Sequence, residues 1–263
     1  MNCRICHSTA LKLYYTQGNT DQYKLYKCEQ CGLVNLDLDG IDITQNQEKY
    51  EYLNELPDPF DPKFNKGNMA TYTFIKRKIR EKGSFLDIGC GSGALLFYAR
   101  QDGWQVKGLE LSEHLAKEVK KTHGIEVDAI NFMDMEDFSE TYDLVTLRHV
   151  LEHIPDSLLV MSKIHKLLKP SGHAVLEFPN IEGVSFTIKR LLNRFGLAKN
   201  KFNPDFVPGH CNEFSKKSFY YLADKTGFKI IKWETYSRNS IASCFYKLFP
   251  VGTKTRVLIE KKG

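Results

Sequence analysis

The segment FLDIGCGSGA at residues 85–94 constrains the fold of this chain more than any other feature. It joins a short apolar run to glycines at alternate positions, Gly89, Gly91 and Gly93, and an apolar helical stretch follows. Glycines at this spacing let the backbone turn tightly and approach a ligand with no Cβ in the way. A strand, a glycine-rich turn and a helix in this order predict a nucleotide-cofactor cradle in an α/β fold.

Two classes of ligand use such a turn. Gly89, Gly91 and Ala94 satisfy the dinucleotide pattern G-x-G-x-x-A, and Glu110 lies near the ~20-residue offset of a ribose-binding acid. S-adenosylmethionine is the other ligand, and Asp87 discriminates between the two. A carboxylate at the lip of the turn disfavours a pyrophosphate, whereas it favours a ligand that carries an ammonium and a sulfonium. We therefore expect S-adenosylmethionine.

Apolar, strand-like runs alternate with helical stretches along the rest of the chain. Such alternation implies crossover units and a parallel sheet. The helix after Pro155 is the best marked, with Asp156 near the positive end of its dipole and Gly172 beyond its end. Ligands of such folds bind at the carboxyl ends of the strands. The strand-like runs are 85–88, 106–111, 144–147 and 174–178.

Four further segments resemble motifs of the class I methyltransferases and extend the resemblance over about residues 65–260. In that family they are the second strand with its terminal acid, the pair at the adenine, the fourth strand with its His-Val-Leu-Glu-His continuation, and the helix end that leads into the fifth strand. The segments are QVKGLELS at 105–112, Asn131-Phe132, YDLVTLRHVLEHIP at 142–155 and LLKPSGHAVLEFPN at 167–180.

The resemblance implies a Rossmann-like α/β fold with a mostly parallel seven-stranded sheet. Glu110, followed by Leu111, corresponds to the acid that takes both ribose hydroxyls, and Asn131 with Phe132 to the pair that contacts the adenine. The cofactor-binding candidates are Asp87, Gly89, Gly91, Gly93, Glu110, Leu111, Asn131, Phe132 and Arg148.

The first forty residues contain a second strong pattern, two cysteine pairs at two-residue spacing. Cys3 and Cys6 form one pair, and Cys28 and Cys31 form the other. Each pair can present both thiolates to one tetrahedral Zn²⁺, and the stretch between the pairs is long enough for a hairpin. Two disulfides or a redox pair are the alternatives, but no signal peptide precedes Cys3 and no strand leads into a redox helix. We expect a structural zinc site bound by all four cysteines.

Length and composition divide the 263 residues into a small module and one α/β domain. The predicted units are 1–40, a zinc-binding module; 41–82, a linker and N-terminal helix; and 83–263, the cofactor-binding domain, with a lid-like insertion at 181–212. About forty residues cannot bury enough surface to fold alone, so the metal is expected to stabilise a module whose core is separate from that of the glycine turn.

The linker is polar and contains prolines, and it is expected to lead into a helix from about Lys63 to Glu81. Tyr50 and Tyr52 precede this helix and either contact the cofactor or substrate or simply pack. The other cysteines, expected as free thiols in a reducing cytoplasm, are Cys90, Cys211 and Cys244.

Charge and hydropathy disfavour some partners. The formal net charge of +5 is modest for this length and does not by itself imply nucleic acid. No apolar run approaches the ~18 residues that a membrane span needs. A basic amphipathic helix is expected at 186–195, with an apolar face formed by Ile188, Leu191, Leu192 and Phe195. It either packs this face on the domain or forms a lid over an anionic or lipid-linked acceptor.

Methyl transfer to many acceptors requires a base, and histidines are the candidates. The segment PGHCNEFS at 208–215 resembles one of the sugar C-methyltransferases, in which a histidine precedes Phe-Ser and the serine caps the next helix. Those enzymes also carry an N-terminal four-cysteine zinc module. The resemblance implies His210 as the base that faces the acceptor, with His149 as a second candidate near the methionine end of the cofactor. His153 is expected to cap or pack. Gly209 stands where those enzymes have a glutamate, and their extra C-terminal domain is absent from this sequence.

Three functions follow from these patterns. The first is a methyltransferase that acts on a small molecule: a sugar, a sugar nucleotide or a related biosynthetic intermediate. The second is a zinc-ribbon RNA base methyltransferase, which the few basic residues of the first forty, Arg4, Lys12, Lys24 and Lys27, disfavour. The third is a non-catalytic scaffold with a zinc interaction module, and the intact glycine turn argues against it.

Overall fold

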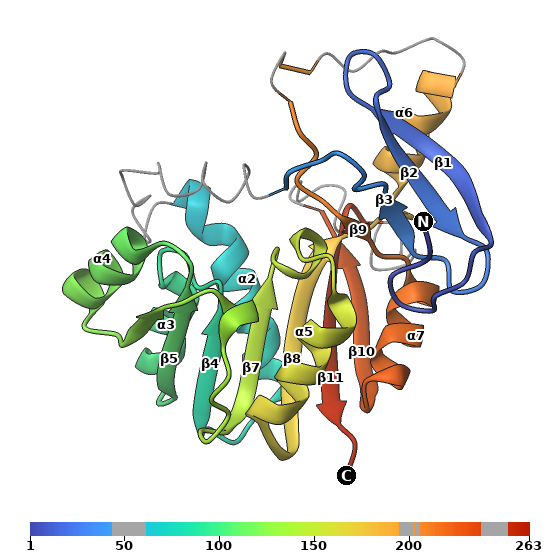
Figure 1. Cartoon of the computed structure of the whole chain (residues 1–263). Helices are drawn as coiled ribbons and strands as arrows, with labels where there is room; N and C mark the ends of the chain where they lie inside the picture. Colours follow the sequence, from blue (N-terminus) through green and yellow to red (C-terminus); the bar gives the residue numbers. More distant parts are fainter. Residues whose placement is uncertain (44–61, 195–201, 204–205, 238–251) are drawn as a thin grey trace.

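The computed structural model describes residues 1–43, 62–194, 202–203, 206–237 and 252–263 (Figure 1). A seven-stranded sheet carries helices on both faces, and a four-stranded sheet lies at one corner of the molecule, beside the half that contains β8, β10 and β11. Tyr50, Tyr52, Phe195 and Cys244 lie outside the described residues.

The large sheet has the strand order β10-β11-β8-β7-β4-β5-β6. Its strands β8, β7, β4, β5 and β6 are parallel, and β11 pairs antiparallel with both β8 and β10. This confirms the predicted mostly parallel seven-stranded sheet. The strands are β4 (Ser84–Ile88), β5 (Gln105–Glu110), β6 (Val127–Ala129), β7 (Tyr142–Arg148), β8 (Leu168–Pro179), β10 (Phe228–Tyr236) and β11 (Lys254–Lys261).

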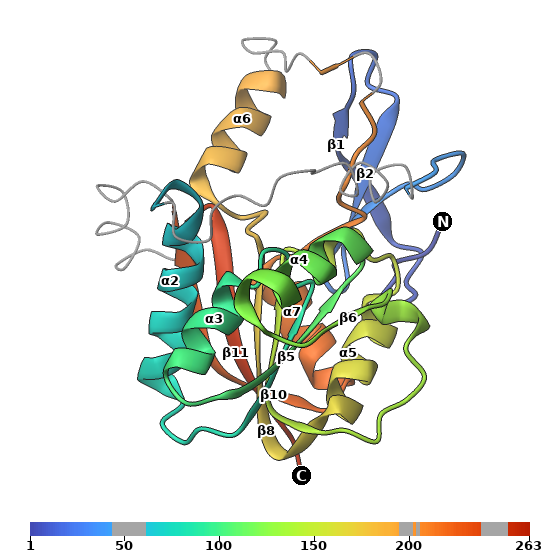
Figure 2. The same ribbon diagram turned by 90° about the vertical axis from the view of Figure 1, so that its left-hand side faces the viewer.

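Helices cover both faces of this sheet, as Figure 2 shows with the sheet turned. Phe85 of β4 packs in one apolar cluster with Ile75 of α2, and the same cluster includes residues of α3. Leu86, the next residue of β4, packs in the opposite cluster with Ile164 of α5. This alternation reflects the period of two of a β-strand. The helices are α2 (Pro62–Lys78), α3 (Ala94–Gln101), α4 (Glu113–His123), η1 (Phe132–Asp134), η2 (Leu151–His153), α5 (Ser157–Leu167), α6 (Val184–Arg194) and α7 (Lys216–Lys225).

Side chains cap the helices where the sequence predicts it. Asp156 accepts the N–H of Leu159 at the start of α5. Ser215 and Ser218 form a reciprocal capping box at the start of α7. Such caps satisfy backbone N–H groups that have no partner inside the helix. The helix predicted after the linker is present as α2, and it ends at Lys78 rather than at the predicted Glu81.

The small sheet combines the N-terminal residues with a strand from the second half of the chain. Its order is β1-β2-β3-β9, and β9 (Asn212–Glu213) pairs antiparallel with β3 (Val34–Leu36). Arg4 donates to the carbonyl of Cys211 at 2.8 Å and to Oδ1 of Asn212 at 3.1 Å. The other strands are β1 (Leu11–Gln17) and β2 (Tyr23–Cys28).

The N-terminal residues also share the main core. Cys3, Cys31 and Leu33 belong to the same buried cluster as Leu86 and Ile88 of β4. The expectation of a separate core for this module is therefore wrong. Pairing of β9 with β3 places the module against the large domain, and the apolar side chains of both pack in one cluster.

The predicted basic amphipathic helix is present as α6, but its apolar face is not packed on the domain. Ile188 and Leu191 are 50% and 54% exposed, and Leu192 is 36% exposed. The helix is instead held against the small sheet by Phe186, which packs against the cluster that contains Ile181, and by Arg190, whose guanidinium lies 4.2 Å from the ring centroid of Tyr14. The interpretation of α6 as a helix packed along its whole stripe is thus wrong for these three residues. In the part of the chain that is described, no helix is long and apolar enough to cross a membrane.

Candidate functional site

The glycine turn lies at the carboxyl end of β4, where the sequence predicts a ligand. The N–H groups of Gly89 and Cys90 both donate to the carbonyl of Leu109, which ties the turn to β5. Gly91 has a φ of 53°, and a Cβ added there would meet nothing within 4 Å. The backbone is thus in a conformation that favours glycine, and it borders open space.

Glu110 closes the turn from the end of β5. Its Oε2 accepts the N–H of Gly91 at 2.8 Å, and its Oε1 accepts the N–H of Ser112 at 3.1 Å. Two backbone donors therefore fix this carboxylate beside the turn, which is the position expected of an acid that binds a ribose. The next residue, Leu111, is 40% exposed.

Asp87 is the buried charge of this region. It is 2% exposed and accepts a hydrogen bond from the hydroxyl of Thr146. Burial raises the pKa of Asp87 to about 6, although the nearby Arg148 partly opposes the shift. Arg148 is itself engaged by Glu177, whose Oε2 accepts its Nε–H at 2.9 Å. A desolvated carboxylate of this kind gains from a cationic ligand.

A short loop after β6 holds the two residues predicted at the adenine. The side chain of Asn131 accepts the N–H of Met133 at 3.0 Å, and Phe132 is buried. Lys163 of α5 supports this loop, because its Nζ donates to the carbonyls of Met133 and Met135, both at 2.6 Å. Nothing in the sequence pattern singles out Lys163, since it reads as an ordinary polar position of a helix.

A second group of polar side chains surrounds Glu152, which is 1% exposed. Its Oε1 lies 3.2 Å from Nδ1 of His149. Glu152, His153 and His210 each offer a ligand atom, and these atoms lie within 4.8 Å of one another. The rings of His153 and His210 meet edge to face, with centroids 5.0 Å apart. Residues far apart in the sequence thus meet around one buried carboxylate.

Glu152 is held in its charged form at a cost in solvation. Burial works against the charge, yet the hydrogen bond with His149 keeps the pKa of Glu152 below its usual range. Its Oε2 is buried and has no hydrogen-bond partner among the described residues. A buried oxygen without a donor is costly, so a donor on a bound ligand would be stabilised here.

The histidines of this cluster are fixed by different partners. Nδ1 of His153 lies 2.7 Å from the carbonyl of Gly209, so it carries the proton and donates. Nε2 of His149 lies 2.8 Å from Nζ of Lys254 on β11. His149 also has a φ of 56°, a left-handed conformation that is uncommon outside glycine. Burial alone would lower the pKa of His210, but Glu213 and Glu152 raise it above its ordinary value.

The structure brings the predicted site residues together in two groups. The cofactor-binding candidates lie at or just after the carboxyl ends of β4, β5, β6 and β7. The catalytic candidates His149 and His210 both lie near Glu152. Several residues of the site were not predicted from the sequence, although Glu152, Glu177 and Glu213 stand inside the quoted motifs, Glu152 and Glu213 each within three residues of a candidate histidine. The missed residues are Glu152, Lys163, Glu177, Glu213 and Lys254.

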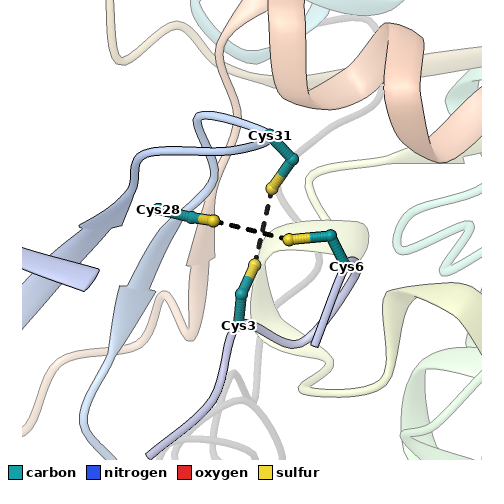
Figure 3. A group of neighbouring side chains, drawn as sticks. All are labelled: Cys3, Cys6, Cys28 and Cys31. Atoms are coloured by element: carbon teal, nitrogen blue, oxygen red, sulfur yellow. Dashed lines mark hydrogen bonds between the residues drawn. The ribbon is translucent and has the colours of Figure 1, made fainter. Parts of the chain in front are cut away.

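The four N-terminal cysteines converge at the edge of the small sheet (Figure 3). The Sγ atoms of Cys3 and Cys31 lie 3.4 Å apart, as do those of Cys6 and Cys28, and all four sulfurs lie within 4.8 Å of one another. Tetrahedral Zn–S bonds of about 2.3 Å require sulfurs about 3.8 Å apart. The hydrogen bond from Cys31 lowers the pKa of Cys3 to about 4, while the same contact raises that of Cys31. The donor set and its spacing therefore fit Zn²⁺.

Together, the fold and the glycine turn define a class I methyltransferase. The chain belongs to the methyltransferase domain family, whose model matches residues 60–232.

Similar proteins with curated names are ubiquinone biosynthesis O-methyltransferases. The protein from Vibrio cholerae serotype O1 is 37% identical over 95 residues, which cover 34% of this chain and 38% of that protein. The protein from Xanthomonas oryzae pv. oryzae is 30% identical over 171 residues, which cover 59% of this chain and 70% of that protein. The chain spans about two fifths of the length of the Vibrio and Aliivibrio relatives that it matches.

Solved structures share the fold at low sequence identity. The PH0226 protein from Pyrococcus horikoshii OT3 has a TM-score of 0.60 at 17% identity, covering 82% of this chain and 99% of that one. The N-methyltransferase NodS from Bradyrhizobium japonicum WM9, in complex with S-adenosyl-L-homocysteine, has a TM-score of 0.56 at 13% identity, covering 84% of this chain and 100% of that one. Likeness at this level concerns the fold alone.

Proposed function

We propose that this protein transfers a methyl group from S-adenosylmethionine to a hydroxyl group of a small molecule. The observation that carries the proposal is the unpartnered Oε2 of Glu152, buried among histidines at the end of the strand next to the glycine turn. One hydroxyl of the acceptor would donate to this oxygen, and a nearby imidazole would take the proton of the hydroxyl that is methylated.

The cofactor assignment follows the geometry of the first group. Asp87 offers a desolvated negative charge to a cationic ligand, and the backbone at Gly91 leaves room for the ligand to approach. Gly89 and Gly93 shape the turn through their positive φ. Glu110 and Leu111 would hold the ribose. The adenine would lie against the loop of Asn131 and Phe132. Arg148, which donates to Glu177, would hold the end of β7 in place beside the cofactor.

For methyl transfer, the protein has to align the acceptor with the cofactor and accept one proton from the acceptor hydroxyl. S-adenosylmethionine, when bound, supplies an electrophilic methyl group on a cationic sulfur. As the acceptor oxygen bonds to the methyl carbon, the carbon–sulfur bond breaks and the hydroxyl proton must leave. His210 would take this proton, and His149 is the second candidate. A base with a pKa near the working pH is suited to this step.

The names of the relatives support an oxygen acceptor, since they are O-methyltransferases of ubiquinone biosynthesis. They do not support a sugar, and the predicted sugar or sugar-nucleotide acceptor stays a prediction. An anionic or lipid-linked acceptor also stays a prediction, although the exposed apolar face of α6 is consistent with it. Neither the RNA methyltransferase nor the scaffold interpretation gains support from the relatives.

We also propose one structural Zn²⁺ bound by Cys3, Cys6, Cys28 and Cys31. Four thiolates fill a tetrahedral shell and leave no open position for catalysis. The metal would hold the N-terminal loop and the β2–β3 turn together, and through β9 it would support the segment that contains His210.

An acceptor panel tests this function. Purified protein would be incubated with S-adenosylmethionine and, separately, with phenols that carry vicinal hydroxyls, nucleotide sugars, lipid-linked sugars and RNA, and S-adenosylhomocysteine formation would be measured. We expect turnover with a hydroxyl-bearing small molecule and none with RNA. Methylation of RNA alone, or of a carbon or nitrogen atom in the product, would contradict the proposal.

A further inference from the structure

Glu213 links His210 to the N-terminal sheet. It lies on β9 and pairs with Val34 of β3, and it is 9% exposed. Its Oε1 lies 3.7 Å from Nδ1 of His210, and the same oxygen accepts the hydroxyl of Tyr15 at 2.8 Å. One carboxylate therefore contacts both the proposed base and a strand of the cysteine-containing module.

Tyr15 is held by contacts on both its ring and its hydroxyl. Its ring meets Phe186 of α6 edge to face, with centroids 5.1 Å apart. The amide of Gln17 donates to its hydroxyl at 3.4 Å. Burial raises the pKa of Tyr15 well above its ordinary value, so the phenol stays neutral and keeps its proton for Glu213. The small sheet thus fixes the same oxygen of Glu213 that lies beside His210.

The contacts of His210 define which nitrogen can act. The charged and titratable groups that face it are Glu213, Glu152, His153 and, beyond Glu152, His149. A carboxylate beside Nδ1 favours the proton on that nitrogen and leaves the lone pair on Nε2, as a carboxylate does for a histidine in other acid-base sites. The same negative charge stabilises the imidazolium that forms when Nε2 takes a proton.

We propose that Glu213 is a positioning residue for His210, that Tyr15 orients Glu213, and that the N-terminal module is therefore part of the acceptor site. This rests on the proposed function of His210 as the base. Proton uptake at Nε2 would produce an imidazolium whose charge Glu213 balances across Nδ1–H.

Nitrogen-15 NMR of histidine-labelled protein tests the proposal without any acceptor. The pH titration of His210 gives its pKa, and the two ring-nitrogen shifts above that pKa give its tautomer. In the Glu213→Gln variant we expect the pKa of His210 to fall by about one unit, since an opposing charge near 4 Å is lost. In the Tyr15→Phe variant we expect the Nδ1–H tautomer to lose population, because the carboxylate is retained but no longer oriented.

A matched pair elsewhere provides the control. Nε2 of His173 lies 3.8 Å from Oε2 of Glu260 on the large sheet. The Glu260→Gln variant removes the carboxylate of that pair and should leave the pKa and tautomer of His210 unaltered. Far-UV circular dichroism and zinc content equal to wild type would show that the Tyr15 and Glu213 variants are folded.

Two results would overturn the proposal: a His210 pKa unchanged by Glu213→Gln, or a tautomer unchanged by Tyr15→Phe, in folded protein. Calorimetric S-adenosylmethionine binding, measured on the same samples, separates this failure from a failure of the proposed function. If the wild-type protein did not bind S-adenosylmethionine, the proposed function would be refuted. If cofactor binding were normal but the pKa and tautomer of His210 did not change in the variants, only the role of Glu213 would be refuted.

Discussion

The proposed cofactor region and the proposed acceptor region are built in different ways. Most of the cofactor region comes from one stretch of chain, residues 87–132, and its donors are largely backbone groups of a continuous strand, turn and helix. The acceptor region combines the N-terminal sheet, η2, β9 and β11. The difference shows that a ligand common to a whole family can be held by a local motif, while the acceptor site depends on segments brought together by the complete fold.

The two regions also treat their buried carboxylates differently. Burial disfavours the ionised form of Asp87 and raises its pKa to about 6. Glu152 keeps its charge, because His149 lowers its pKa. The first carboxylate is suited to a cationic ligand that arrives from solvent, and the second is suited to imidazoles that are always present.

Removing the metal should give the largest effect and should affect the acceptor region most. The Cys28→Ser variant is expected to lose zinc, whose binding in small modules contributes on the order of 10 kcal/mol to folding. Metal analysis and thermal unfolding measure the loss. Because the module shares the core cluster of β4, we expect the melting temperature of the whole protein to fall. Cofactor affinity should change little, because the glycine turn is held by Leu109 and Glu110 of β5 rather than by the module. Equal zinc content in the variant and wild type would rule out the four-cysteine site.

The proposed base should give the next largest effect. The His210→Ala variant is expected to lower turnover by about 10²–10⁴-fold, the usual range for a positioned acid-base group. Its S-adenosylmethionine affinity should stay at the wild-type value. His173→Ala, on the large sheet, is the matched control and should retain full turnover. Near-normal turnover in His210→Ala would contradict the assignment of His210 as the base and would leave His149 as the base or show that none is needed.

Replacing the carboxylates of the cofactor region should have a smaller effect, and it should change cofactor affinity rather than the chemical step. Asp87→Asn and Glu110→Ala are each expected to weaken S-adenosylmethionine by roughly 1 to 3 kcal/mol, which corresponds to loss of a charged hydrogen-bond partner. Titration calorimetry measures both affinities. The exposed Asp137→Asn variant has the same charge change and should bind normally. If Asp87→Asn also bound normally, the carboxylate at the turn would not contact the ligand.

The pH dependence of cofactor binding should give the smallest effect. The pKa of Asp87 is raised to about 6 in the unliganded fold, so a cation that prefers the ionised form should bind more tightly as pH rises through 6. We expect affinity about tenfold higher at pH 7 than at pH 5, which is about 1.4 kcal/mol. The same shift should make this carboxyl destabilise the unliganded fold as pH rises from about 4 to about 6. Asp87→Asn should remove the dependence, and a flat wild-type profile would contradict the assignment.

Local patterns allowed much of the cofactor region to be predicted. The turn at Gly91, the fixed carboxylate of Glu110 and the caps Asp156 and Ser215 all depend on neighbours within a few residues or on one adjacent strand. Their physical cause lies in the backbone of one or two elements, so sequence spacing is sufficient to identify them.

Long-range contacts explain what sequence could not predict. Tyr15 and Glu213 are 198 positions apart, and Lys254 and His149 are 105 apart. No spacing rule connects such residues, because their meeting depends on β9 joining the small sheet and β11 entering the large one. The exposed face of α6 was also unpredictable, since an amphipathic pattern shows which residues share a face but not what covers it.

The most direct test of the account is calorimetry of the wild-type protein with S-adenosylmethionine and, separately, with NADH. We expect S-adenosylmethionine to bind at micromolar affinity, which is about −8 kcal/mol, and NADH to give no heat of binding. Tight NADH binding without S-adenosylmethionine binding would contradict the assignment of the glycine turn, and with it the proposed function.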